Sequence, residues 1–356
     1  MGQPVSLETM DPQPNLVGTS RAELAALLAA HDPRPFRVSQ VYHWVTRRLA
    51  ASLDEMTDLP AALRAGLAGS CRLADPDVVA VRRAGDGTAK YGLRLGDGAI
   101  VEAVVMPMEG RTTICLSSQG GCAVGCVFCV TGALGAGRNL TGGEIFGQFR
   151  AVVRAERLLG SPLNVVFMGM GEPLLNLPGV TRALDLLAEL VSPRRVTVST
   201  AGIVPGIRVL ADLPRRPNLA ISLNATTDEQ RRALMPVAAR WSLDELLATL
   251  HAYPLERGRR ITVEYVLIAG VNDGLEDAAR LPALLRRLPV KVNLIPLNTD
   301  PLLPAWLATP SVESVDRFGA ALAAAHLNVT VRWSKGREVS GACGQLRGAL
   351  SAATEA

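Results

Sequence analysis

Three closely spaced cysteines are the residues of this 356-residue chain best suited to chemistry. Cys122, Cys126 and Cys129 follow the pattern Cys-x3-Cys-x2-Cys, so their three thiolates can surround one inorganic centre. A closed zinc site takes four ligands, and standard iron–sulfur clusters are held by four cysteines. Three local thiolates would therefore leave one iron of a [4Fe–4S] cluster without a protein ligand. An iron with an open position can bind a substrate, so the spacing favours a catalytic cluster over one that only stores electrons.

Two other interpretations of these cysteines are weaker. They could be ordinary buried small hydrophobic residues, but they cluster too tightly for that role to be convincing. They could belong to a structural zinc site with a distant fourth ligand. However, the chain has only four histidines, none in a pair with metal-ligand spacing, and its other cysteines are too scattered to form a second Cys-x2-Cys unit.

A glycine-rich motif at 168–173, ending in Gly171-Glu172-Pro173, follows a predicted strand. Glycines let the backbone approach a ligand closely, and Glu172 is an anion that could receive an ammonium group. The alternative is a simple glycine turn with a solvated glutamate.

Short polar segments follow other predicted strands. Such side chains can hydrogen-bond a nucleoside ligand, although each signal alone is weak because turns after strands are usually polar. The candidate residues are Ser199, Ser222, Leu223, Asn224 and Asn298.

Two further cysteines stand apart from the cluster motif. Cys115 lies in a predicted strand, and Cys343 lies in the segment Gly-Ala-Cys-Gly near the C-terminus. Glycines beside Cys343 indicate a loop outside the packed core, so we interpret this thiol as reactive. Cys71 has no such context and is expected to be inert.

Composition restricts the class of protein. Apolar residues make up 48% of the chain and charged residues 20%, which suits a large buried core, and six cysteines are too few for a disulfide framework. We find no signal-peptide pattern and no apolar stretch of about 18 residues, so we expect a soluble protein of the reducing cytoplasm. The net charge is +4, and arginines occur in pairs such as Arg47-Arg48, which leaves nucleic-acid binding open.

The elements that must position these residues divide the chain into five parts. Residues 1–19 contain prolines without periodicity, and we expect disorder there. A capping box at Ser20–Glu23 and a helical rhythm of apolar residues predict a helical domain over 20–74. Three strand-like segments separated by Asp-Gly turns predict a small antiparallel meander over 75–108.

From residue 109 to 335 strands alternate with helices, which predicts a parallel sheet and, with about six units, a partial (β/α)6 barrel. Residues 336–356 form the loop and tail that carry Cys343. In such barrels the chemistry collects at the carboxyl ends of the strands, where the polar motifs lie. The predicted strands are 113–117, 164–168, 195–199, 219–223, 261–267, 291–295 and 328–332. The predicted helices include 143–158, 180–190, 243–251, 276–288 and 312–325.

The order of motifs resembles that of the RlmN-type dual-specificity RNA adenine-C2 methyltransferases, which are related to the Cfr resistance methyltransferases. The resemblance covers roughly residues 34–347. It rests on the cysteine loop together with segments 42–44, 56–60, 115–119, 138–141, 167–176, 193–202, 271–273 and 342–346. The chain departs from the family pattern at Asn224, where histidine is usual, at 297–299, and at 334–338 near the expected substrate.

The resemblance implies a radical S-adenosylmethionine (SAM) enzyme. Cys122, Cys126 and Cys129 would hold one [4Fe–4S] cluster, and one electron would cleave SAM bound at the open iron to a 5′-deoxyadenosyl radical. Further SAM contacts would come from Gly171, Glu172, Ser199, Ser222, Leu223, Asn224 and Asn298.

It also implies a covalent mechanism that uses two SAM molecules per turnover. Cys343 would carry the methyl group as S-methylcysteine and form a transient crosslink to RNA. Glu102 would accept the C2 proton, although its sequence context alone suggests an exposed strand carboxylate. Cys115 would resolve the crosslink through a transient disulfide with Cys343.

The implied substrates are 23S rRNA and tRNA, at the adenine just 3′ of the anticodon. The implied electron donor is a flavodoxin or ferredoxin, and we expect a monomer. The alternatives are a non-catalytic iron–sulfur or zinc RNA-binding protein, a Cfr-like C8 methyltransferase, and a radical SAM enzyme with another substrate. The run Pro173-Leu174-Leu175 is closer to the C2 group.

Overall fold

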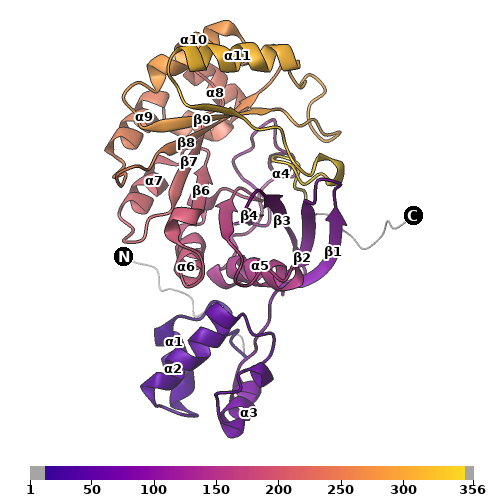
Figure 1. Ribbon diagram of the computed structural model, residues 1–356, viewed down its shortest axis with the longest axis vertical. Coiled ribbons are helices and arrows are strands. Elements are labelled where there is room, and N and C mark those ends of the chain that lie inside the picture. Colours follow the sequence, from indigo (N-terminus) through magenta and orange to yellow (C-terminus); the bar gives the residue numbers. More distant parts are fainter. Residues whose placement is uncertain (1–12, 349–356) are drawn as a thin grey trace, which may run out of the picture.

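The computed structural model describes residues 13–348, and a single ten-stranded sheet organises them (Figure 1). The strands are ordered in space as in the chain. The first four pair antiparallel, and β4 to β10 pair parallel. The strands are β1 (Asp77–Arg83), β2 (Ala89–Arg94), β3 (Ile100–Met108), β4 (Arg111–Cys115), β5 (Leu163–Phe167), β6 (Val196–Thr200), β7 (Asn218–Ser222), β8 (Ile261–Leu267), β9 (Val290–Pro296) and β10 (Val329–Val331). The predicted α/β class with a parallel, partial-barrel sheet is confirmed.

The antiparallel meander is continuous with the barrel sheet. Val104 of β3 lies opposite both Lys90 of β2 and Cys115 of β4. Side chains of directly opposite residues lie on the same face of a sheet, as do those of residues two apart on one strand. Lys90, Glu102 and Cys115 therefore share one face. The meander therefore places Glu102, a predicted site residue, on the same face of the sheet as Cys115 of the barrel.

Helices cover the parallel part of the sheet and connect its strands (Figure 1). All seven predicted strands are present, each displaced by two residues or fewer. The long helices begin where the sequence provides a cap, as at α5, where Thr141 and Glu144 form a capping box. The helices of this region are α4 (Val130–Ala133), α5 (Gly142–Ala155), α6 (Leu177–Leu187), α7 (Val204–Ala211), α8 (Asp228–Leu234), α9 (Leu243–Ala252), α10 (Leu275–Leu284) and α11 (Val312–Ala324).

Three of these helices, α4, α7 and α8, were not anticipated. Each is short, and α7 carries Pro205 and Gly206 in its first turn, residues that normally indicate a loop. Proline is nevertheless compatible with the first turn of a helix, where its missing N–H leaves no intrahelical bond unmade. Burial of Val204, Ile207 and Leu210 then stabilises the helix.

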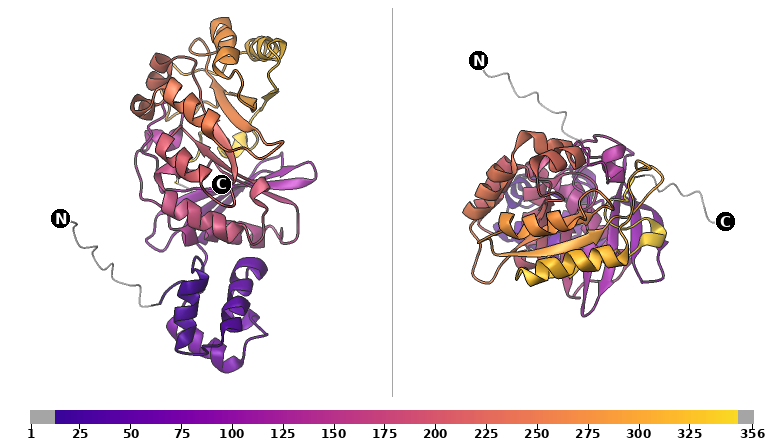
Figure 2. Two further views of the ribbon diagram at one scale, coloured as in Figure 1. Left: turned by 90° about the vertical axis from the view of Figure 1, so that its left-hand side faces the viewer. Right: turned by 90° about the horizontal axis from the view of Figure 1, so that it is seen from above.

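A helical domain protrudes from one end of the molecule (Figure 2). It contains α1 (Arg21–Ala29), α2 (Pro35–His43), a π-helical turn at Trp44–Arg48 and α3 (Ala61–Ser70). The predicted capping box at the start of α1 is present. Arg150 of α5 attaches this domain to the barrel. Its guanidinium is buried and donates to Asp75 Oδ1 at 2.6 Å and to the Ala50 carbonyl at 2.7 Å.

The expectation of disorder over 1–19 is wrong for residues 13–19, and residues 1–12 lie outside the described range. Leu16 and Val17 are buried, and the Leu16 N–H donates to the Arg72 carbonyl at 2.8 Å. Two adjacent apolar residues are too few to show periodicity, although they suffice to anchor a short segment. Among residues 13–348 no helix has both the length and the apolar character required to span a membrane.

Candidate active site

The cysteine loop leaves the carboxyl end of β4 and returns to the start of α5, and its two ends are joined. Gln119 and Asn139 form an isolated antiparallel bridge, and the Gly120 N–H donates to the Arg138 carbonyl at 2.9 Å. Asn176 donates to the carbonyls of Ser118 and Leu140, each at 2.8 Å. These bonds close the base of the loop that carries the three cysteines.

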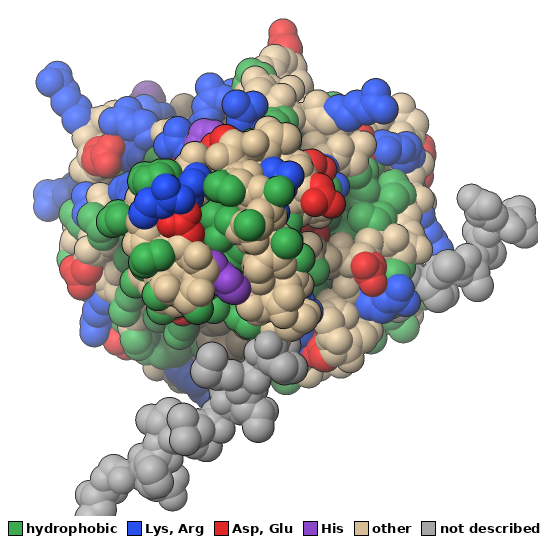
Figure 3. Space-filling model, turned by 90° about the horizontal axis from the view of Figure 1, so that it is seen from below, with side chains coloured by type: hydrophobic (Ala, Val, Ile, Leu, Met, Phe, Trp, Pro, Cys, Tyr) green, Lys and Arg blue, Asp and Glu red, His purple; other side chains and the backbone are tan. Residues whose placement is uncertain are grey.

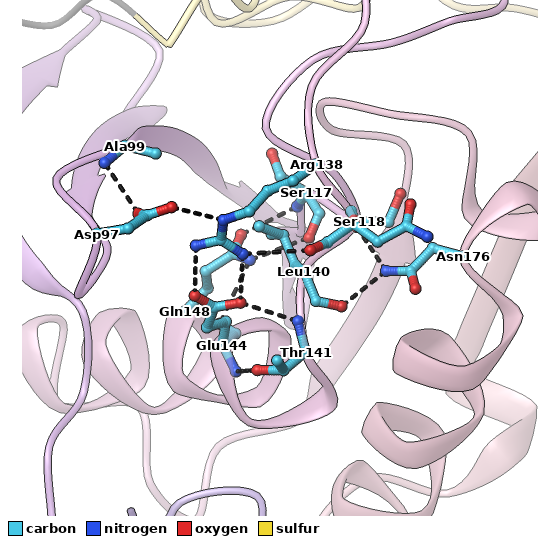
Figure 4. A network of polar contacts seen from close by, with 11 residues as sticks. Asp97, Ala99, Ser117, Ser118, Arg138, Leu140, Thr141, Glu144, Gln148 and Asn176 are labelled. Atoms are coloured by element: carbon cyan, nitrogen blue, oxygen red, sulfur yellow. Dashed lines mark hydrogen bonds and ion pairs between the residues drawn. The ribbon is translucent and has the colours of Figure 1, made fainter. Parts of the chain in front are cut away.

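Arg138 fixes this base from outside (Figure 4). Its guanidinium donates to Asp97, in the turn between β2 and β3, at 2.6 Å and to Glu144 at 2.7 Å. Both ion pairs are partly exposed and individually contribute little to stability. Their role is to fix geometry, because Arg138 connects the loop to the meander through Asp97 and to α5 through Glu144. Glu144 also caps α5.

The three cysteines line the same cavity. Burial raises the pKa of Cys122 to about 12 and that of Cys126 well above its ordinary value, so these thiols are protonated until a metal displaces the proton. Three thiols that line one cavity fit a [4Fe–4S] cluster with one open iron.

The cavity lies at the carboxyl ends of strands β5 to β9 and encloses about 980 Å³ of empty space, part of it open to solvent. Its lining combines Cys122, Cys126 and Cys129 with Gly171, Glu172, Ser199, Ser222, Asn224, Glu264, Asn298, Arg332 and Cys343, among others.

The glycine motif packs against the cysteine loop. Gly171 has a φ of +98°, and a Cβ there would lie 2.5 Å from the Gln119 Cβ. A Cβ at Gly169 would lie 2.7 Å from the Leu116 carbonyl carbon. These glycines therefore allow two loops of the protein to approach each other, in addition to lining the cavity.

Glu172 is buried, which excludes the solvated turn considered above. Its carboxylate accepts hydrogen bonds from the backbone N–H groups of Ala201 at 2.7 Å and Leu174 at 3.0 Å. Burial raises the pKa of Glu172, and these two N–H donors oppose that rise. Glu172 lines the same cavity as the three thiols, and a buried carboxylate in this position suits an ammonium partner.

The other predicted SAM contacts divide into two groups. Ser199 and Ser222 line the cavity, whereas Leu223 is buried and lies outside the lining. Asn224 lines the cavity, but its Oδ1 accepts from the Val266 N–H at 2.8 Å and thereby joins the ends of β7 and β8. A role for these residues in SAM binding stays a prediction.

Asn298 connects the cavity to the C-terminal segment. Its Nδ2 donates to the Ser334 hydroxyl at 2.8 Å and to the Cys343 carbonyl at 3.2 Å. Cys343 itself is exposed within the cavity. The predicted loop character of this segment agrees with the structure, and Asn298 holds the backbone at Cys343. The reactivity of this thiol stays a prediction.

Cys115 is buried in β4 beside this site, outside the cavity lining, and burial raises its pKa to about 12. The charge of Cys343 adds to this rise, so the two thiols influence each other. Both are free in the structure, and no disulfide is present among residues 13–348. A standing disulfide is therefore not supported.

Glu102 is fully buried, which corrects the interpretation of an exposed strand carboxylate. It lies 3.4 Å from Lys90 Nζ and accepts from the Arg347 N–H at 3.2 Å. Desolvation raises the pKa of Glu102, and Lys90 opposes that rise. Glu102 is outside the cavity lining and is covered by the C-terminal segment.

Two cavity residues, Glu264 and Arg332, were missed by the sequence interpretation. Glu264 interrupts the apolar strand β8, and a charged residue in a buried strand is a signal that could have identified it. Arg332 follows β10 with no comparable sequence signal.

Comparison with known proteins places these features in a family context. Residues 116–281 match the model of the radical SAM superfamily, and residues 14–73 match the ribosomal RNA large subunit methyltransferase N-terminal domain. The dual-specificity RNA methyltransferase RlmN of Anaeromyxobacter sp. is 49% identical, with 94% of this chain and 91% of the relative covered. The RlmN of Geobacter sulfurreducens is 44% identical over 96% of this chain and 94% of its own.

A crystal structure is also similar over nearly the whole chain. It is that of a radical SAM methyltransferase from Sphaerobacter thermophilus, with a TM-score of 0.89 and 44% sequence identity. The match covers 94% of this chain and 99% of that chain.

Proposed function

Because the chain belongs to the RlmN family of dual-specificity RNA methyltransferases, which are radical SAM enzymes, we propose that it methylates carbon C2 of adenine in RNA. The proposed substrates are 23S rRNA and tRNA, in the latter at the adenine just 3′ of the anticodon. The observation that supports this most directly is the presence of Cys343 and the three-cysteine loop on one cavity.

The chemistry explains why a cluster and a lone thiol would occur together. Adenine C2 lies between two ring nitrogens and is electron-poor, so it cannot displace the methyl group of SAM as a nucleophile. When bound at Cys122, Cys126 and Cys129, the cluster would supply the electron that cleaves SAM and so generates a carbon radical able to activate a methyl group. Cys343 would hold that methyl group, taken from a first SAM molecule, so two SAM molecules are used per turnover.

Three residues of the chain would then complete the reaction. The methylene radical on the Cys343 sulfur would add to C2 and so form a transient protein–RNA crosslink, and this radical adduct would give up one electron to the external electron carrier and its C2 proton to Glu102. The Cys115 thiolate would attack the Cys343 sulfur, which forms a transient disulfide and breaks the bond from that sulfur to the methylene carbon; this carbon would take up a proton and leave as the methyl group of the base. An external thiol would reduce the disulfide before the next turnover. Since Glu102 is covered by the C-terminal segment through Arg347, this proton transfer requires that segment to move.

The methylated nucleoside that forms distinguishes the proposed C2 methylation from methylation at C8 by a Cfr-like enzyme. Purified, anaerobically reconstituted enzyme would be incubated with SAM, a reductant and either an rRNA fragment or tRNA, and the nucleosides analysed by mass spectrometry against standards. We expect 2-methyladenosine. Formation of 8-methyladenosine would favour the Cfr-like alternative, and absence of methylated RNA would contradict both.

We predict that Glu172→Ala weakens SAM binding by roughly 10- to 150-fold, since a hydrogen bond to a charged group contributes about 1.5–3 kcal/mol. The reason is loss of the carboxylate proposed to hold the SAM ammonium group. RNA affinity should stay nearly unchanged. Equilibrium binding of SAM and RNA measures both, with the exposed Glu313→Ala as control. A variant that binds SAM normally but loses RNA would contradict the assignment.

The helical domain is proposed to contact the RNA backbone. Viewed from the end of the molecule that carries this domain, Lys and Arg side chains lie around the surface with fewer acidic ones between them (Figure 3). Arg47 and Arg48 are exposed, although Arg47 is also paired with Glu189 at 3.0 Å, whereas Arg37 is buried and paired with Asp32 at 2.8 Å. The exposed pair is therefore better suited to phosphate contact than Arg37.

We predict that the double change Arg47→Ala/Arg48→Ala lowers RNA affinity and reduces the slope of log affinity against log salt by up to about 2, because each lost phosphate contact removes close to one unit. Fluorescence anisotropy at several salt concentrations measures this. Arg286→Ala/Arg287→Ala removes a second exposed pair, before β9, and should leave the slope unchanged. Equal effects of the two double variants would argue against a specific role for the helical domain.

Cleavage of SAM also requires an electron from outside the chain. The sequence has only one cluster motif, so the electron must come from a separate donor such as flavodoxin or ferredoxin. We propose a monomeric enzyme acting in the cytoplasm, where its RNA substrates are located.

A further inference from the structure

We propose that Glu264 and Arg332 form the subsite that recognises the edge of the target adenine carrying N6 and N1. This inference rests on the proposed function, because it concerns the base that would react at Cys343. Both side chains line the cavity into which Cys343 is exposed.

The first observation is an unsatisfied carboxylate. The Glu264 side chain is only 7% exposed, and its Oε1 accepts a hydrogen bond from Asn293 Nδ2 at 3.0 Å. Its Oε2 is buried and has no hydrogen-bond partner within the described part of the chain. Leaving a buried carboxylate oxygen unpaired costs free energy, so such an atom beside a ligand cavity indicates a missing donor.

The second observation is the position of Arg332. Its Nη1 lies 3.9 Å from Glu264 Oε1, too far for a hydrogen bond, and its side chain is 43% exposed. The guanidinium therefore keeps free donors beside an unsatisfied acceptor.

The two groups share one cavity with the thiol that would carry the methyl group, since Glu264, Arg332 and Cys343 all line it. In addition, desolvation chiefly raises the pKa of Cys343, Arg332 lowers it, and Glu264 raises it. A ligand bound between Glu264 and Arg332 would consequently present its nearest atoms to Cys343.

Adenine complements this pair in both polarity and position. Its exocyclic N6 amine is a donor that can satisfy Glu264 Oε2, and its N1 is an acceptor for the Arg332 guanidinium. C2 is bonded directly to N1, so the atom to be methylated would lie on the side of Cys343. Guanine would instead place its O6 acceptor against the carboxylate and its N1–H donor against the guanidinium. The pair thus selects adenine and also orients it.

The test compares two RNAs that differ only in one amino group of the target base. One carries adenosine at the target position, and the other carries purine riboside, which lacks the N6 amine. For the wild-type enzyme we expect kcat/KM to favour adenosine by roughly 5- to 150-fold, the range for one well-placed pair of base contacts. Glu264→Ala should lower activity on adenosine RNA and reduce the preference to near one. Glu264→Gln should retain most of the preference, since the amide keeps a carbonyl acceptor and Asn293 can present either end of its own amide.

Readouts without RNA separate base recognition from SAM binding. Methylation of Cys343 and formation of 5′-deoxyadenosine should be unchanged in Glu264→Ala, and thermal unfolding should match the wild type. Glu276→Ala, at a carboxylate that is 89% exposed on α10, serves as the matched control and should keep the full preference.

Three results would overturn the proposed subsite. An unchanged preference in Glu264→Ala overturns the subsite while leaving the proposed function intact. Impaired Cys343 methylation or SAM cleavage without RNA reassigns Glu264 to SAM and also overturns it. A wild-type enzyme that methylates neither RNA removes the proposed function and, with it, this inference.

Discussion

A Cys115→Ala variant is expected to accumulate a covalent protein–RNA species where the wild type releases its product. Cys115 is required only to resolve the crosslink, so the variant should still be methylated at Cys343 and still attack RNA. The stalled species should resist SDS and disappear on treatment with RNase. Denaturing gel electrophoresis with labelled RNA measures it, and the expected effect is the near-complete loss of turnover.

The control for this experiment is another buried cysteine. Cys71 ends α3 and is as inaccessible as Cys115, so Cys71→Ala tests the cost of losing a buried sulfur, about 1 kcal/mol for a typical substitution. It should turn over normally. A Cys115→Ala protein that turns over like the wild type would show that a different group resolves the crosslink, and a misfolded one without crosslink would indicate a structural role for Cys115.

Replacement of any one of Cys122, Cys126 or Cys129 by Ala should abolish the brown absorbance of reconstituted protein and all cleavage of SAM. The reason is that three thiols are the only ligands that the local motif offers, and two cannot hold the cluster with one open iron. Absorbance, iron content and 5′-deoxyadenosine formation after dithionite reduction measure the effect.

Cys343→Ala is the matched control, since Cys343 lines the same cavity without belonging to the motif. It should keep the absorbance and lose both protein methylation and the crosslink. Continued RNA methylation by a triple variant at Cys122, Cys126 and Cys129 would refute the proposed chemistry entirely.

The sequence was sufficient to predict those features that are encoded locally. Strand and helix periodicities identified all seven parallel strands, and the spacing of three cysteines within eight residues identified the centre of the cavity. Local patterns also identified Gly171 and Glu172, because a motif of adjacent residues carries its own geometry.

Features that depend on contacts between distant segments were not predictable in this way. Glu102 was interpreted as exposed because its partner Lys90 is on another strand and Arg347 lies near the other end of the chain. Glu264 had a local signal, its charge within an apolar strand, but its proximity to Arg332 and its hydrogen bond with Asn293 had none. The hydrogen bond from Asn298 to the Cys343 carbonyl was likewise not predicted, while its contact with SAM stays a prediction.

The C-terminal segment is hydrogen-bonded directly to the helix that follows the cysteine loop. The Val130 N–H donates to the Gly344 carbonyl at 2.7 Å, and the Thr131 hydroxyl donates to the Leu346 carbonyl at 2.6 Å. Val130 is the residue immediately after Cys129, so any change in the order of the cysteine loop reaches the segment that carries Cys343. Coupling of this kind is reciprocal. Loss of the inorganic centre proposed at this loop would consequently also disturb the segment that carries Cys343, the proposed methyl carrier.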